Sequence, residues 1–154
     1  MIEIEVKGFK KLADLADRYP GISEKHVAKA ITRSLIRIQD SAKRNGPFGT
    51  TGQLRQNWNL KIGRFEGALS SGAKANGFPY GTAVEFGTAP HAMMVNEPFK
   101  LWARRKGLNP YAVANSIKKK GTKANPFFDK SVSEQEEAVN REFDQAINDI
   151  LEEI

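Results

Sequence analysis

Two long stretches of this sequence repeat apolar residues at intervals of three and four, the spacing of one face of an α-helix. The first stretch predicts a helix that Ser23 caps and that runs to Arg44, and we expect it to be the spine of the core. The second predicts a C-terminal helix. The apolar positions are Val27, Ile31, Leu35, Ile38 and Ala42 in the first, and Phe127, Phe128, Val132, Val139, Phe143, Ile147, Ile150, Leu151 and Ile154 in the second.

Four shorter stretches have the composition or the alternation of half-buried strands. They are residues 2–6, the end of 53–62 after a helical turn, the small-residue run 67–72, and 80–86. In the last of these, Val84 and Phe86 alternate with Ala83 and Glu85. The turn formers that separate them lie at 45–52 and 74–79.

Three further helices are predicted, at 9–19 before Pro20, at 97–106, and after Asn109, which can cap a helix that starts at Pro110. Phe99, Leu101 and Trp102 would anchor the second helix, and Val113 and Ile117, with Tyr111 as a further candidate, would form the buried side of the third. We therefore predict one α+β domain over residues 1–154. An antiparallel sheet of about four strands would pack against the helix at 23–44 and the C-terminal helix, with a basic helical insert at 89–123.

Little in the sequence points to catalysis. The chain has no cysteine, which excludes disulfides, thiolate zinc sites and a thiol nucleophile. His26 and His91 are too far apart in sequence to form a helical metal pair, and no glycine-rich loop has the lysine of a phosphate site. Glu85 has no accompanying nucleophile, so we expect it to face outward from its strand and pair with a basic residue. We predict no enzyme activity, no cofactor and no metal site.

The chain also lacks a signal-like N-terminus and a long apolar run, so we expect it to be neither secreted by a cleaved signal nor inserted in a membrane.

Charge is distributed unevenly. Residues 100–123 hold eight basic residues and no acid, whereas residues 129–154 hold nine acids and two basic residues. Two interpretations remain open: the two runs are solvated faces that offset each other within the monomer, or they bind other copies of the chain head to tail. The basic run, which includes Trp102 and Tyr111, also allows an alternative function, non-specific binding to nucleic acid through the 100–123 cluster.

Several motifs of this sequence occur in one order that resembles a known family. They are Thr51–Arg55, Ala83–Thr88, Gly121–Thr122 and Pro126–Phe128. In this order, the motifs resemble the bacteriophage tail-completion family, also described as head-to-tail joining, neck or minor tail proteins of long non-contractile-tailed phages. The resemblance runs from the helix before Asn45 to the start of the C-terminal helix. The basic insert between Thr88 and Gly121 departs from the shortest pattern of that family.

The resemblance implies a structural protein of a phage or prophage that joins the finished tail to the head. It implies a ring of copies, with a hexamer expected on the tail, and contacts with tail tube, terminator and head connector proteins. It places the protein in the virion and, during assembly, in the bacterial cytoplasm. Under it, Glu85, Phe86, Gly87 and Thr88 form a strand end and turn, Gly121 and Thr122 a second turn, and Pro126 with Phe127 docks the last helix.

Partner contacts are expected at three places. The loop 47–52 and the arm 89–95 carry turn formers and exposed apolar residues, and the insert carries the basic cluster. The candidate interface residues are Phe48, Arg55, His91, Met93, Met94, Arg104, Arg105, Lys118, Lys119 and Lys120.

Overall fold

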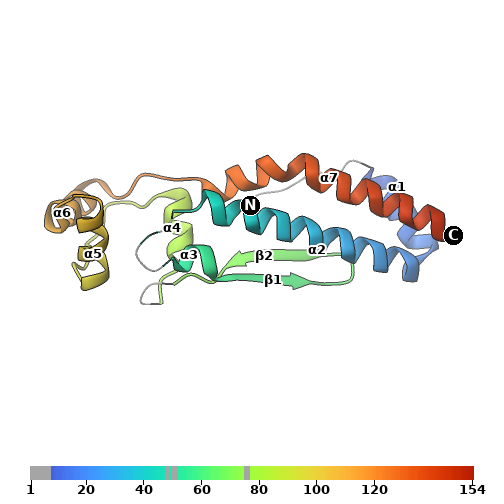
Figure 1. Ribbon diagram of the computed structural model, residues 1–154, viewed down its shortest axis with the longest axis horizontal. Coiled ribbons are helices and arrows are strands. Elements are labelled where there is room, and N and C mark those ends of the chain that lie inside the picture. The colour runs from blue at the N-terminus through green and yellow to red at the C-terminus, as the bar shows by residue number, and fades with distance from the viewer. Residues whose placement is uncertain (1–7, 48, 50–51, 75–76) are drawn as a thin grey trace. The chain divides into compact units, whose positions relative to one another are not determined.

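The structure of the chain is a computed structural model that describes residues 8–47, 49, 52–74 and 77–154. These residues form seven helices and one hairpin: α1 (Phe9–Arg18), α2 (Pro20–Asn45), α3 (Gln53–Gln56), β1 (Trp58–Ile62), β2 (Gly67–Ser71), α4 (Tyr80–Phe86), α5 (Glu97–Arg105), α6 (Pro110–Lys120) and α7 (Phe127–Glu153) (Figure 1). The chain divides into two compact units. Unit 1 comprises Met1–Arg44, Asn59–Ser70 and Asp129–Ile154, and unit 2 comprises Asn45–Trp58 and Ser71–Phe128.

Unit 1 is built around α2 and α7, which lie side by side as the cyan-to-blue and orange-to-red helices of Figure 1. Their apolar stripes meet each other and α1, as the periodicity predicted. Leu151 and Ile154, at the end of the predicted stripe, are exposed instead. The buried cluster consists of Leu12, Leu15, Val27, Ile31, Ile147 and Ile150.

The start of α2 differs from the prediction. The helix begins at Pro20, which needs no amide hydrogen at that position, rather than after Ser23. Ser23 is buried, and its hydroxyl donates to the Leu15 carbonyl at 3.0 Å, which ties the first turn of α2 to α1.

Ion pairs along the edge of unit 1 join α7 to α2. Arg37 contacts Glu142 at 2.9 Å between Nη2 and Oε1, and Lys25 contacts Glu153 at 3.0 Å. His26 lies 2.6 Å from the same Glu153 carboxylate. Part of the acidic run at 129–154 is therefore neutralised by basic residues of α2, a pairing that the charge counts of the two runs did not reveal.

The sheet is smaller than predicted. The described residues contain a two-stranded sheet of β1 and β2 rather than about four strands. The hairpin closes through the Gly63 amide, which donates to the Glu66 carbonyl at 2.8 Å. Of the other two expected strands, residues 2–6 lie outside the described part of the chain, and 80–86 form helix α4.

The strand prediction at 80–86 was wrong because burial there follows a helical spacing. Gly81 and Glu85, four residues apart, are the buried positions of α4. Glu85 is 6% exposed, and Phe86 is 71% exposed, the reverse of the expected alternation. The outward-facing role expected of Glu85 is wrong for the same reason.

Candidate functional site

The Gly-Thr pairs at 87–88 and 121–122 contact each other in unit 2. Thr88 and Thr122 form an isolated antiparallel bridge in which each backbone amide donates to the other's carbonyl at 3.1 Å. Their hydroxyl oxygens are 2.9 Å apart, which allows a further hydrogen bond. We call these four residues the Gly-Thr clasp, because they hold together the two ends of the insert that carries α5 and α6.

Both glycines of the clasp are required by geometry. Gly87 and Gly121 have φ of 71° and 73°, in the left-handed region that side chains disfavour. A Cβ on Gly121 would overlap the Thr88 carbonyl, and one on Gly87 would lie 2.5 Å from the Thr122 carbonyl oxygen. The dipeptides that the sequence suggested as two separate turns are therefore one contact.

The remaining motif residues lie beside the clasp and begin α7. The Phe128 amide donates to Glu85 Oε2 at 2.8 Å, so a buried carboxylate binds one of the amides that a helix leaves unpaired at its N-terminus. The Asn125 amide donates to the Val84 carbonyl at 2.8 Å. Phe127 is buried, and Phe128 stacks on Trp58 with ring centres 5.8 Å apart. Glu85 thus belongs to the end of a helix, not to the expected strand end.

An apolar groove of about 760 Å³ lies next to the clasp in unit 2. The predicted contact residues His91, Met93 and Met94 line it, and Met94 is 72% exposed. Sequence reasoning missed other residues that line the groove. Phe78 was in a predicted turn, Tyr80 in a predicted strand, and Ile117 on the predicted buried side of a helix. Partial burial raises the pKa of Tyr80, an effect that its hydrogen bond with the Leu54 backbone opposes.

His91 lies at the mouth of this groove and is held by local contacts. Its Nδ1 is 2.9 Å from the Ala89 carbonyl oxygen and 3.3 Å from the Thr88 hydroxyl. Glu85 is not among the lining residues of the groove, so the two groups do not form an acid-base pair there.

Helices α5 and α6 form a hairpin, and an asparagine caps each helix; the sequence predicted the cap at Asn109 but not the one at Asn96. Asn96 accepts from the Phe99 amide at 3.1 Å, and Asn109 accepts from the Tyr111 amide at 2.9 Å. Phe99 stacks on Trp102 with ring centres 5.6 Å apart. Tyr111, a candidate for the buried side of α6, is 64% exposed, so that assignment was wrong.

The basic candidates lie at the carboxyl ends of these helices. Arg104 and Arg105 are in the last turn of α5, and Lys118, Lys119 and Lys120 are in the last turn of α6. Cations are favoured there by the helix dipole, which gives these positions a structural reason that requires no partner. Of the other candidates, Arg55 donates to the Gly46 carbonyl at 3.1 Å, and Phe48 lies outside the described residues.

Unit 2 has ten basic and two acidic residues, a net charge of +8. One of the two acids, Glu85, is buried, and the other, Glu97, contacts Lys100 at 2.9 Å. This contact lowers the pKa of Glu97 and raises that of Lys100. Unit 2 therefore cannot neutralise its own cations with carboxylates, and it suits an anionic partner surface.

Two other features are absent from the described residues. No cluster of three or more His, Cys, Asp or Glu side chains there could hold a metal ion. No helix in that part of the chain is both long and apolar enough to cross a membrane. In the comparisons with known proteins, no family model, curated protein or solved structure gives a significant match.

Proposed function

We propose that this protein is a structural component of a phage or prophage virion that completes the tail and joins it to the head. Copies of the chain would assemble as a ring, and the work of the protein would be the formation of interfaces with its own copies, with tail tube or terminator proteins and with head connector proteins. The basic α5–α6 hairpin and the apolar groove of unit 2 are the surfaces that we assign to these contacts.

The observation that carries this proposal is the Gly-Thr clasp. Two of the four motifs on which the family resemblance rests lie 34 positions apart in the chain, at Thr88 and Thr122, yet they form one hydrogen-bonded contact. Two further motif residues lie at the start of α7 in the same unit. Glu85 accepts a hydrogen bond from the Phe128 amide, and Phe127, the first residue of α7, is buried. Motifs that meet in space support the resemblance better than unrelated turns would.

The test is a phage that carries the gene with Arg104→Glu and Arg105→Glu. We expect separate heads and tails to accumulate in electron micrographs, because reversing two charges on the hairpin would oppose docking to an anionic surface. The matched control is Lys10→Glu with Lys11→Glu on α1, which makes the same charge change in unit 1. Normal virions from the hairpin variant would remove the hairpin from the joining interface, and normal virions from a gene deletion would refute the joining function.

A second candidate function, non-specific binding to nucleic acid, is favoured by the charge of +8 in unit 2. Phosphate contacts would give an affinity that falls steeply with salt. In a mobility-shift assay at low salt, the wild type would then retard duplex or single-stranded DNA, and Lys118→Glu with Lys119→Glu and Lys120→Glu would abolish the shift. Absence of a shift at every salt concentration would refute this function.

A further inference from the structure

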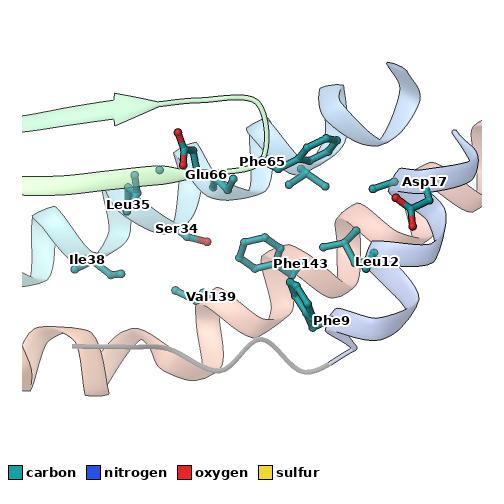
Figure 2. A pocket seen from close by; sticks show the side chains of 15 residues that line it. Phe9, Leu12, Asp17, Ser34, Leu35, Ile38, Phe65, Glu66, Val139 and Phe143 are labelled. Atoms are coloured by element: carbon teal, nitrogen blue, oxygen red, sulfur yellow. The ribbon is translucent and has the colours of Figure 1, made fainter. Parts of the chain in front are cut away.

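Unit 1 contains a second apolar groove, of about 510 Å³, between α1, α2, α7 and the turn that joins β1 to β2. We call it the socket. Its walls include Phe9, Leu12, Phe65 and Phe143, and its volume lies in the range of sites that bury a compact ligand or several side chains. Figure 2 shows the lining side chains around one space, on α1, α2, the turn between β1 and β2, and α7.

A polar group at the base of the socket lacks a partner. Ser34 is only 4% exposed, and its hydroxyl has no hydrogen-bond partner among the described residues. Figure 2 shows this hydroxyl directed from α2 into the socket. Leaving a buried hydroxyl unpaired is costly, so the socket suits an occupant that brings both apolar surface and a hydrogen-bonding group.

The rim of the socket is acidic. Asp17 on α1 and Glu66 in the hairpin turn both line it, and both residues are exposed (Figure 2). Carboxylates at the rim disfavour an anionic occupant and favour a cationic one, whose charges would stay near the edge while its apolar part entered.

The chain itself has a surface of this chemistry, at the tip of the α5–α6 hairpin. Leu108 and Tyr111 are 45% and 64% exposed there, and the exposed Arg104 and Lys106 precede Leu108 by four and two positions. The tip is held in shape by the Leu108 amide, which donates to the Ala103 carbonyl at 2.8 Å, and by the Asn109 cap. A rigid tip loses little entropy on binding, and Tyr and Arg are the residues most often found at the centres of interfaces.

We propose that the socket of one copy binds the hairpin tip of a second copy. Leu108 and Tyr111 would enter the socket, the Tyr111 hydroxyl would bind Ser34, and Arg104 and Lys106 would face Asp17 and Glu66. This proposal rests on the proposed function in that it names the contact between ring neighbours. Such a contact joins two different surfaces, so it forms a closed ring or an open filament according to the rotation between copies.

Charge exchange tests the contact in the full-length protein. Arg104→Glu with Lys106→Glu should weaken self-association about tenfold, as should Asp17→Lys with Glu66→Lys, and the four changes together should restore it. Sedimentation of each variant at the highest soluble concentration measures the effect, and circular dichroism checks the fold. Equal weakening in all three variants, or none in any, would overturn the contact.

Cross-linking locates the contact, because the chain has no cysteine of its own. Ala13→Cys at the socket and Ala112→Cys beside Tyr111 are placed on two separately tagged copies, and a short bis-maleimide joins them if the surfaces meet. We expect a mixed dimer with this pair and only background with Ala13→Cys and Ala124→Cys, since Ala124 is exposed elsewhere in unit 2. No mixed dimer, or an intramolecular product from the double variant Ala13→Cys/Ala112→Cys, would overturn a contact between copies.

The two proposals fail in different ways. If the mixed dimer is absent but the hairpin variant still separates heads from tails, the joining function stands and the hairpin binds another virion protein. If the mixed dimer forms but deletion of the gene leaves normal virions, the copies associate as proposed and the joining function is wrong.

Discussion

Gly121 shows how a single residue can hold a long insert in place. A side chain there would meet the Thr88 carbonyl, and the residue also has φ of 73°. The same is true of Gly87 on the other side of the clasp, whereas Gly107, with φ of 69°, has no heavy atom within 4 Å of its ideal Cβ position. The stability cost of adding a side chain therefore has two parts. Backbone strain is present at all three glycines, whereas steric overlap is present only at the two glycines of the clasp.

Gly121→Ala should destabilise the protein by about 2–4 kcal/mol, because it adds steric overlap to backbone strain. Gly107→Ala should cost only about 1 kcal/mol, since strain acts there alone. Urea denaturation of both variants measures the difference. Equal costs would show that the Thr88–Thr122 bridge does not constrain the chain in solution.

Glu85→Ala should destabilise the protein by about 1–3 kcal/mol, because it leaves the Phe128 amide without its buried acceptor. Glu85→Gln keeps an acceptor and loses only the charge at the helix N-terminus, so its cost should be smaller. The control is Glu97→Gln, which removes an exposed carboxylate and should leave the stability nearly unchanged. Thermal unfolding compares the three, and an effect of Glu85→Ala no larger than that of Glu97→Gln would argue against the cap.

Glu153 predicts a dependence of stability on pH. Hydrogen bonds from His26 and then Lys25 lower its pKa from the ordinary value of 4.5. A carboxyl whose pKa is lower in the folded state stabilises the fold fully above its unfolded pKa, and this contribution is lost as the pH falls through the folded value. Glu153→Gln should therefore lower the Tm at pH values well above 4.5, and this effect should shrink as the pH falls below 4.5. Glu152→Gln removes the same charge on the same turn, and a matching pH profile for it would contradict the role of these hydrogen bonds.

At the scale of elements, a small residue of β2 explains how the β1–β2 hairpin packs against α2. A Cβ on Gly67 would overlap Ile31 and lie 2.9 Å from Leu35 Cδ1. The sequence indicated a weak strand at 67–72 because small residues have low strand propensity. The contact with α2 gives one of these small residues, Gly67, a packing reason.

Gly67→Ala should destabilise the protein by about 1–3 kcal/mol, because the added methyl group forces the hairpin and α2 apart. Ala68→Ser, at the exposed neighbouring position, should have an effect below about 0.5 kcal/mol. Chemical denaturation with tryptophan fluorescence measures both. If Gly67→Ala were as mild as the control, the hairpin would not pack on α2 as closely as described.

At the scale of the whole molecule, the clasp closes the insert into a loop. The two ends of the insert are bonded to each other at Thr88 and Thr122, so the clasp fixes both points where the insert joins the rest of the chain. The exposed apolar and basic residues of the hairpin lie within this loop. The clasp therefore joins the two ends of the stretch of chain that carries α5 and α6.

A variant in which a short glycine-serine turn replaces residues 97–116 should stay folded, because the clasp and α7 are retained. Hydrogen exchange should show unchanged protection in α2 and α7, and self-association should be lost. Replacing residues 80–86 in the same way should instead lower protection at the start of α7, since Glu85 is removed. Loss of hydrogen-exchange protection throughout the first variant would show that the α5–α6 hairpin is part of the core.

The sequence alone determined the long helices, most of their apolar faces, the cap at Asn109 and the hairpin strands, because periodicity and capping depend on residues a few positions apart. Only the tertiary structure decided what Tyr80–Phe86 would form. A segment of seven residues fits a strand or two helical turns equally well, and the deciding contact joins Glu85 to Phe128, 43 residues away. The meeting of the two Gly-Thr pairs and the unpaired Ser34 hydroxyl in the socket likewise depend on distant parts of the chain, which no local pattern records.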